Sequence, residues 1–147
     1  MAVSGSKEFD VKATPAEVMA VVAAVEELPN RSKAHRSAEA ETRYDDGRPK
    51  RVRAKVSTAG FSDEEVTDYT WDDDHKVTWT LVSSGVQSKQ VGSYTLTPTD
   101  NGTHVLFELE IDVKVPMPGF LLKKVLGGAL TSGSKDFAKY VENRPKS

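Results

Sequence analysis

The longest regular pattern in this chain is an alternation of apolar and polar residues that continues with few interruptions from residue 35 to residue 115. Neighbouring side chains of a β-strand point to opposite faces, so a period of two predicts strands over this stretch. The clearest strand is residues 103–115, where every second side chain from Val105 to Val115 is apolar. One apolar face per strand predicts an antiparallel sheet that is covered on one side only.

Turn sequences containing Gly divide this stretch at residues 45–47, 59–60 and 100–102. Together with connections at residues 72–76 and between Leu81 and Gln90, which are expected to pair, they indicate six consecutive strands. An alternating segment at residues 6–13 precedes them and is expected to be a seventh strand.

Helix signals follow the first strand directly. Thr14 is a good N-cap, Pro15 suits the first helical position, and Glu17 completes a capping box. We expect this helix to extend to about Val25. A second short helix or turn is expected to end at residues 28–29.

The last apolar pattern, residues 120–141, has the period of a helix but contains Gly127, Gly128 and Gly133. Each glycine costs roughly 1 kcal/mol relative to Ala in a helix interior. Small residues there indicate either a close approach of the backbone or empty volume beneath the helix. Its buried stripe is expected to comprise Leu122, Leu126, Ala129, Leu130, Gly133, Phe137, Tyr140 and Val141.

Charges set the expected register around the basic strand at residues 50–57. Acidic residues recur at matching spacing on both neighbouring strands, given a tight turn at 59–60 and a connection through 45–49. Opposite charges directly across two strands contribute roughly 0.2–1 kcal/mol per pair. The expected pairs are Lys55 with Glu64, Arg51 with Asp68, Arg53 with Glu41, and Lys55 with Glu39.

The same register decides which aromatic side chains face the covered side of the sheet. It sets Tyr69 beside Trp79 and places Trp79 over Gly92, an aromatic covering a strand glycine. Trp71 and Tyr94 complete the set. Aromatics beneath a glycine-containing helix indicate a pocket for an apolar small molecule, and ordinary core packing is the alternative. The expected ligand contacts are Tyr69, Trp71, Trp79, Gln90, Tyr94, Phe107, Leu109, Leu126, Leu130 and Gly133.

Glu65 is the carboxylate that this register places deep on the inner face. Apolar rings around it would raise its pKa and suit it to general acid or base chemistry. Tyr94 is the second catalytic candidate. The alternative for Glu65 is a carboxylate near the rim that is solvated or paired with Arg36.

Metal and cofactor chemistry find no support in the sequence. The histidines, His35, His75 and His104, are scattered and do not neighbour one another in the expected register, and there is no cysteine. The acidic run at residues 72–75 lacks the spacing of a calcium loop and is expected to be a solvated turn. We therefore expect no metal and no cofactor.

Composition limits the classes of partner. The chain has 147 residues and a net charge of −2, which suits one domain over residues 1–147 and argues against nucleic-acid binding. It lacks a signal-peptide pattern and any apolar stretch of transmembrane length, so we expect a cytoplasmic location without stable membrane insertion. Residues 142–147 are expected to form a loose tail, and nothing indicates the oligomeric state.

Several short segments, taken in order, carry a family resemblance. They are residues 13–18 (ATPAEV), Leu28-Pro29, residues 92–96 (GSYTL) before 101–103 (NGT), and residues 116–121 (PMPGFL). Across nearly its whole length the chain resembles the START-like helix-grip superfamily, and more closely the bacterial polyketide cyclase/dehydrase and lipid transport family.

The resemblance implies an α+β helix-grip fold, in which a curved seven-stranded antiparallel sheet wraps around a long C-terminal helix. Two short helices are expected between strands 1 and 2, and a cavity between sheet and last helix would be open to a hydrophobic ligand. The family usually carries Trp just after the Pro of the Leu-Pro segment. Here Asn30 and Arg31 follow Pro29, so the usual lip of the pocket is altered.

Three functional hypotheses follow, because this fold hosts carriers, enzymes and interaction proteins. The first is binding, with transport, of a lipid or polyketide-like molecule. The second is a cyclase or dehydratase that uses Glu65 or Tyr94. The third is an interaction protein whose cavity is filled by its own side chains.

Overall fold

The computed structural model describes residues 2–58 and 60–144, which form seven strands and four α-helices. Strand β1 (Val3–Val11) is followed by helices α1 (Pro15–Ala23) and α2 (Leu28–Arg31), with a 3-10 turn at Val25–Glu27 between them. The remaining strands are β2 (His35–Arg43), β3 (Pro49–Thr58), β4 (Phe61–Asp72), β5 (Lys76–Ser83), β6 (Gln87–Thr99) and β7 (Gly102–Val113). Helix α3 (Gly119–Thr131) continues through a π-helical turn, Ser132–Asp136, into α4 (Phe137–Asn143).

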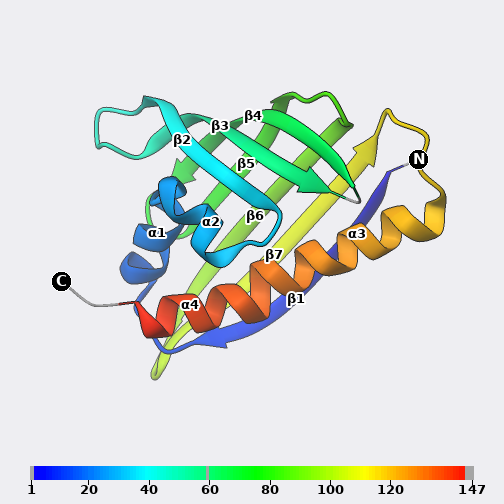
Figure 1. The fold of residues 1–147 in the computed structure, drawn as a ribbon. Helices are drawn as coiled ribbons and strands as arrows, with labels where there is room; N and C mark the ends of the chain where they lie inside the picture. The colour runs from blue at the N-terminus through cyan, green and yellow to red at the C-terminus, as the bar shows by residue number, and fades with distance from the viewer. Residues whose placement is uncertain (1, 59, 145–147) are drawn as a thin grey trace.

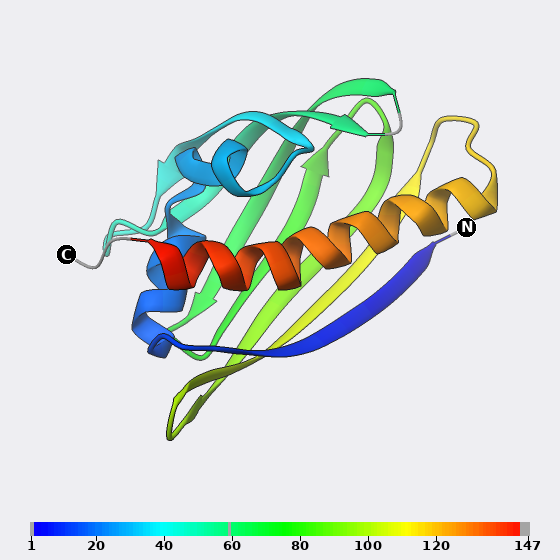
Figure 2. The same cartoon turned by 60° about the horizontal axis from the view of Figure 1, so that its bottom comes forward.

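The strands form one antiparallel sheet in the order β1-β7-β6-β5-β4-β3-β2. This sheet curves around α3 and α4, which cross its concave side as one long helical rod (Figures 1 and 2). Helices α1 and α2 lie beside α4 at one end of the rod in both views. The expected helix-grip fold, with seven strands and short helices between strands 1 and 2, is confirmed.

The start of α1 forms as the sequence predicts. The backbone N–H of Thr14 donates to Glu17 Oε1 (2.9 Å), and the N–H of Glu17 donates to the Thr14 hydroxyl (3.2 Å). The helix ends at Ala23, two residues before the expected end, because Ala24 has left the helical region with ψ 64°. The chain then tightens into the 3-10 turn that leads to α2.

Charge pairing fixes the register on one side of β3 but not on the other. Lys55 lies opposite Glu64 and Arg51 opposite Asp68, as expected. On the β2 side the expected pairing of Lys55 with Glu39 is wrong, because Glu39 lies opposite Arg53. The remaining expected pair, Arg53 with Glu41, makes a 2.9 Å ion pair without being directly opposite in the ladder.

Irregularities in the β2–β3 ladder explain the difference. Register shifts fall on either side of Thr42, so Glu41 has no directly opposed partner. An extra residue in one strand shifts the pairing locally, while the length of an arginine side chain still allows diagonal ion pairs. Charge pattern alone therefore does not distinguish the two registers.

The aromatic inner face has the expected arrangement. Tyr69 pairs with Trp79, and Trp79 lies opposite Gly92. A Cβ atom on Gly92 would lie 2.2 Å from the Trp79 ring, so the glycine makes room for the indole. Ring contacts continue from Trp79 to Tyr94 (5.4 Å between centroids) and from Tyr94 to Phe107 (4.8 Å).

Two of the helix glycines differ sharply in what lies next to them. A Cβ atom on Gly133 would lie 2.3 Å from the Phe107 ring, whereas one on Gly127 would meet nothing within 4 Å. At the π-helical turn the N–H of Phe137 donates to the carbonyls of Ser132 and Ser134 instead of to Gly133. The Gly133 carbonyl accepts a hydrogen bond from the Tyr94 hydroxyl (2.7 Å), which ties the helix to the sheet.

The end of the chain is more ordered than the expected tail. Helix α4 includes residue 142, and the backbone N–H of Lys12 donates to Glu142 Oε2 (2.9 Å). Arg144 forms a 3.0 Å ion pair with Glu27. Residues 145–147 lie outside the described residues.

Alanine at Gly127 and at Gly133 should have opposite effects on stability. Gly127→Ala improves helix propensity in open space, so the free energy of unfolding should rise by about 0.5–1 kcal/mol. Gly133→Ala forces a methyl group against a buried ring, so it should fall by about 1–3 kcal/mol. Urea unfolding of both variants measures this, and a harmless Gly133→Ala would contradict the close contact.

Candidate functional site

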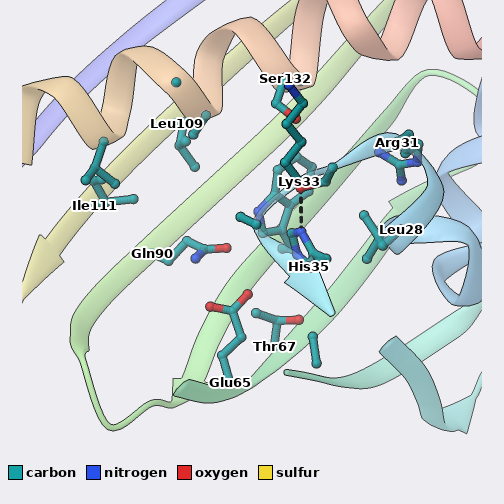
Figure 3. Close-up of a pocket in the computed structure, with 18 of the residues that line it drawn as sticks. Leu28, Arg31, Lys33, His35, Glu65, Thr67, Gln90, Leu109, Ile111 and Ser132 are labelled. Carbon is teal, nitrogen blue, oxygen red and sulfur yellow. Dashed lines mark hydrogen bonds between the residues drawn. The ribbon is translucent and has the colours of Figure 1, made fainter. Parts of the chain in front are cut away.

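A pocket of about 490 Å³ lies between the concave face of the sheet and helix α3 (Figure 3). Its volume falls within the range typical of small-molecule sites. Residues of α1 and α2, of strands β2 to β7, of α3 and of the π-helical turn line it. Most of its wall is apolar, and polar side chains gather in two places, around Glu65 and around Arg31.

Seven of the ten predicted contact residues line this pocket. They come from β4, β5, β6, β7 and the π-helical turn, so residues far apart in sequence meet around one space. Contact with a ligand stays a prediction for each of them. The seven are Tyr69, Trp79, Gln90, Tyr94, Phe107, Leu109 and Gly133.

The other three predicted contact residues lie elsewhere. The indole N–H of Trp71 donates to the Pro49 carbonyl (2.8 Å), beside the pocket rather than in its wall. Leu126 and Leu130 pack toward Gly5 of β1, where an added Cβ would lie 3.6 Å and 2.8 Å from them. The helix thus uses its strongest apolar stripe to pack on β1.

The helix residues that do face the pocket form a weaker shoulder beside that stripe. They include Val125, Gly128, Ala129 and Ser132. Small and polar residues give little periodic signal, and of these four only Ala129 belongs to the expected buried stripe. A Cβ atom on Gly128 would meet nothing within 4 Å, which means that the space beneath this residue is open.

Glu65 lies in the wall of the pocket and is only 7% exposed. Gln87 Nε2 donates to Glu65 Oε2 (2.8 Å), and Gln90 Nε2 donates to Gln87 Oε1 (2.9 Å). Glu65 makes no ion pair within the described residues, so the alternative of a solvated rim carboxylate paired with Arg36 is wrong. One buried carboxyl group and two amides thus form a connected polar group in an apolar wall.

Gln87 is a residue that the sequence analysis missed. A register shift between Gln87 and Lys89 adds one residue to β6, so Gln87 and Gln90 both reach the pocket although they are three residues apart. Strict alternation would place them on opposite faces. The sequence carries no clear signal for this bulge.

Burial raises the pKa of Glu65 from 4.5 to about 7. The nearby carboxylate of Asp63 raises it further, and the hydrogen bond from Gln87 opposes the shift. Asp63 is itself held in place, because its carboxylate accepts from the Gly85 N–H (2.7 Å) and from the Ser84 hydroxyl. Near neutral pH, Glu65 therefore exists in both its protonated and its ionised forms.

Tyr94 is less suited to proton transfer than the sequence suggests. Its hydroxyl donates to the Gly133 carbonyl, and burial raises the pKa of its phenol well above the usual value. Burial also raises the pKa of Tyr69 to about 12. Both phenols stay protonated at neutral pH, and the hydroxyl proton of Tyr94 is already used in the hydrogen bond to the Gly133 carbonyl.

The wall of the pocket contains a second polar group, which consists of Arg31, Lys33 and His35 (Figure 3). The Ser32 hydroxyl lies 2.7 Å from His35 Nδ1. Burial, followed by the charge of Arg31, lowers the pKa of His35 to about 4, so its imidazole is neutral. The sequence analysis placed His35 only at the start of a strand and did not include it in the site.

The other histidines lie away from the pocket. His104 binds Asp10 (2.9 Å) and Glu8 (3.1 Å) on neighbouring β1, and His75 lies in the β4–β5 turn. Over residues 2–58 and 60–144, no three metal-ligating side chains come together. No helix in that part of the chain is long and apolar enough to cross a bilayer.

Comparison with known proteins identifies the family. The sequence matches the family described as polyketide cyclase / dehydrase and lipid transport over residues 2–142. This chain belongs to that family. The predicted resemblance to the polyketide cyclase/dehydrase and lipid transport family is therefore confirmed. No curated protein matches the sequence.

Solved structures that resemble this chain include a START superfamily protein. A START superfamily protein from Mycobacterium smegmatis is 26% identical, with a TM-score of 0.81 over 96% of this chain and 97% of that one. The Zhui aromatase/cyclase from Streptomyces sp. R1128 is 12% identical, with a TM-score of 0.82 over 100% and 98%. A protein from Thermus thermophilus, TTHA0849, is 20% identical, with a TM-score of 0.74 over 96% and 97%.

The raised pKa of Glu65 predicts a pH-dependent stability. The folded state holds this proton more tightly than the unfolded state, so the contribution is fully present below pH 4.5 and is lost as the pH rises through about 7. Relative to Glu65→Gln, which does not ionise, the wild type should lose up to roughly 3 kcal/mol of unfolding free energy between these limits. Urea titrations of both proteins across this range measure the difference, and a difference independent of pH would contradict the shift.

Proposed function

We propose that residues 1–147 act as one ligand-binding domain that takes a lipid or polyketide-like molecule into the pocket beneath α3. The pocket itself, about 490 Å³ with an aromatic wall, is the observation that carries this proposal. A space of this size also speaks against the hypothesis of an interior filled by its own side chains.

The chemistry of the wall supports an apolar guest. Burying apolar surface contributes roughly 25 cal/mol per Å² before the guest and the wall are ordered. Ordering the wall costs little here, because Trp79, Tyr94 and Phe107 already contact one another, with 5.4 Å and 4.8 Å between successive centroids. The group around Glu65 then supplies the few polar contacts that orient a ligand in such sites.

The family description, which includes both cyclase/dehydrase and lipid transport, agrees with this class of guest. Carriage of the guest between locations is part of the proposal. The absence of a membrane-spanning helix among the described residues is compatible with a carrier that does not insert stably.

A bulky side chain at Gly128 should block the pocket. Gly128→Phe projects a ring into the open space beneath α3, so affinity for the neutral fluorophore N-phenyl-1-naphthylamine should fall at least about tenfold. Gly127→Phe is the matched control, because Gly127 is the adjacent glycine of the same helix and does not line the pocket. Fluorescence titration measures both, and equal effects of the two substitutions would contradict binding beneath α3.

A cyclase or dehydratase is the second candidate function, and the buried Glu65 is the observation that favours it. A carboxyl group with a pKa near 7 exchanges protons readily at neutral pH. Its ionised form would take a proton from the carbon beside the carbonyl of a β-hydroxy ketone. Its protonated form would return that proton to the β-hydroxyl, which departs as water and leaves a carbon–carbon double bond.

This second function predicts a separation of binding from proton transfer. Wild-type protein should accelerate deuterium exchange at the carbons beside the carbonyl of 2-dodecanone, followed by NMR in D₂O. Glu65→Gln should bring the exchange rate to that of buffer while leaving affinity for 2-dodecanone within about twofold. Exchange that is absent in the wild type, or equal in both proteins, would reject the enzymatic hypothesis and leave the binding proposal intact.

A further inference from the structure

Arg31 is a cation at the pocket that makes no ion pair of its own within the described residues, because the Glu27 carboxylate within its electrostatic reach is paired with Arg144. It belongs to α2, is half-buried and lines the pocket. Its Nε is a buried side-chain nitrogen with no hydrogen-bond partner, and no ion pair joins Arg31 to any residue in the described part of the chain. A buried donor that stays unpaired is unfavourable, so such groups call for an explanation.

The guanidinium group is held in position by an aromatic ring. Its central carbon lies 5.1 Å from the centroid of the Phe137 ring. Phe137 is fully buried and stacks on Tyr94 with 4.8 Å between centroids. A cation fixed over an aromatic face loses little freedom when it binds a ligand.

Neighbouring charges make this region positive. Arg31 and Lys33 also line an adjoining, shallower hollow of about 400 Å³, together with Lys139 and Asp136. Three cations and one carboxylate line this hollow, and the neighbouring Glu27 and Arg144 pair with each other, whereas the whole chain carries a net charge of −2. The nearby imidazole of His35 is neutral, so it does not add to this charge.

Arg31 and Glu65 lie at different places in the wall of the pocket. Arg31 contacts Phe137, which stacks on Tyr94 of β6, whereas Glu65 is hydrogen-bonded to Gln87 at the start of the same strand. The buried Tyr69 lies within electrostatic reach of both groups. The wall therefore has a cationic region and a carboxyl–amide region, with aromatic side chains between them.

From this arrangement, and resting on the proposed function, we infer that the ligand is an amphipathic molecule with an anionic head, a carboxylate or a phosphate, bound by Arg31. Lys33 and Lys139 flank the head, and the apolar body extends along the aromatic wall toward Glu65.

Anionic oxygens supply what Arg31 lacks. A guanidinium group donates two parallel hydrogen bonds to a carboxylate or phosphate, and such charge-assisted bonds are about twice as strong as neutral ones. A guest without an acceptor at this position would leave the buried Nε unpaired, and a neutral oxygen would accept a hydrogen bond without compensating the positive charge. The head group is therefore the part of the ligand that distinguishes this pocket from a merely apolar one.

Twelve-carbon probes that differ only in the head group test the inference. Dodecanoate, dodecyl phosphate and dodecanol are titrated against bound N-phenyl-1-naphthylamine. At least one anionic probe should bind about tenfold to a hundredfold more tightly than dodecanol. The anion whose affinity exceeds that of dodecanol by the larger factor identifies the head group. Equal affinity of all three probes for the wild type would overturn the inference and leave the proposed function standing, whereas failure of every probe and of the fluorophore to bind would overturn both.

Substitutions test whether Arg31 causes the preference for an anionic head group. Arg31→Gln should bring the anion and alcohol affinities within about twofold of each other. Arg36→Gln is the control, because it removes the same charge from a nearby exposed position that does not line the pocket. An equal loss of the anion preference in both variants would mean that net charge alone causes it, and would overturn the assignment of the head-group site to Arg31. If Arg31→Gln does not fold, the exposed pair Lys33→Gln and Lys139→Gln should lower the preference several-fold, and an unchanged preference would count against the site.

Discussion

The contact of the Phe107 ring with Gly133 is the constraint on which the rest of the structure depends. It brings the C-terminal helical rod down onto the sheet at a position where only a glycine fits. The π-helical turn leaves the Gly133 carbonyl without the N–H of Phe137, and the Tyr94 hydroxyl takes that place. π-Helical turns of this kind are frequent at functional sites. The helix is thereby anchored at one point, and open space remains five residues earlier, beneath Gly128.

Much of the fold could be predicted because local signals agree with one another. The capping box at Thr14, the alternation of the strands and the glycine-containing turns each predict the element that forms. The register of β3 with β4 and the covering of Gly92 by Trp79 also followed, since tight turns leave few alternatives. The β2 register did not follow, because its ladder contains shifts that charge pairs tolerate.

The site was only partly predictable, for related reasons. Alternation sufficed to place Glu65 inside, but a bulge in β6 brought Gln87 to it, and bulges leave no clear mark in a sequence. On the helix, periodicity found the strongest apolar stripe, which packs on β1, and included only Ala129 of the weaker shoulder that faces the pocket. Arg31 lies next to the Leu-Pro segment, where the sequence predicted an altered lip of the pocket. Its contact with Phe137, however, depends on the three-dimensional structure.

The chain contains only two tryptophans, and they occupy contrasting environments. Trp79 lies in the pocket wall, whereas the Trp71 indole is bonded to the Pro49 carbonyl and has the Arg48 guanidinium 4.9 Å from its centroid. An incoming molecule would contact Trp79 directly, whereas the ring of Tyr69, 6.0 Å from each indole centroid, separates Trp71 from the pocket. The protein thus carries an intrinsic emission reporter of occupancy together with its own internal reference, which allows uptake to be followed without any attached dye.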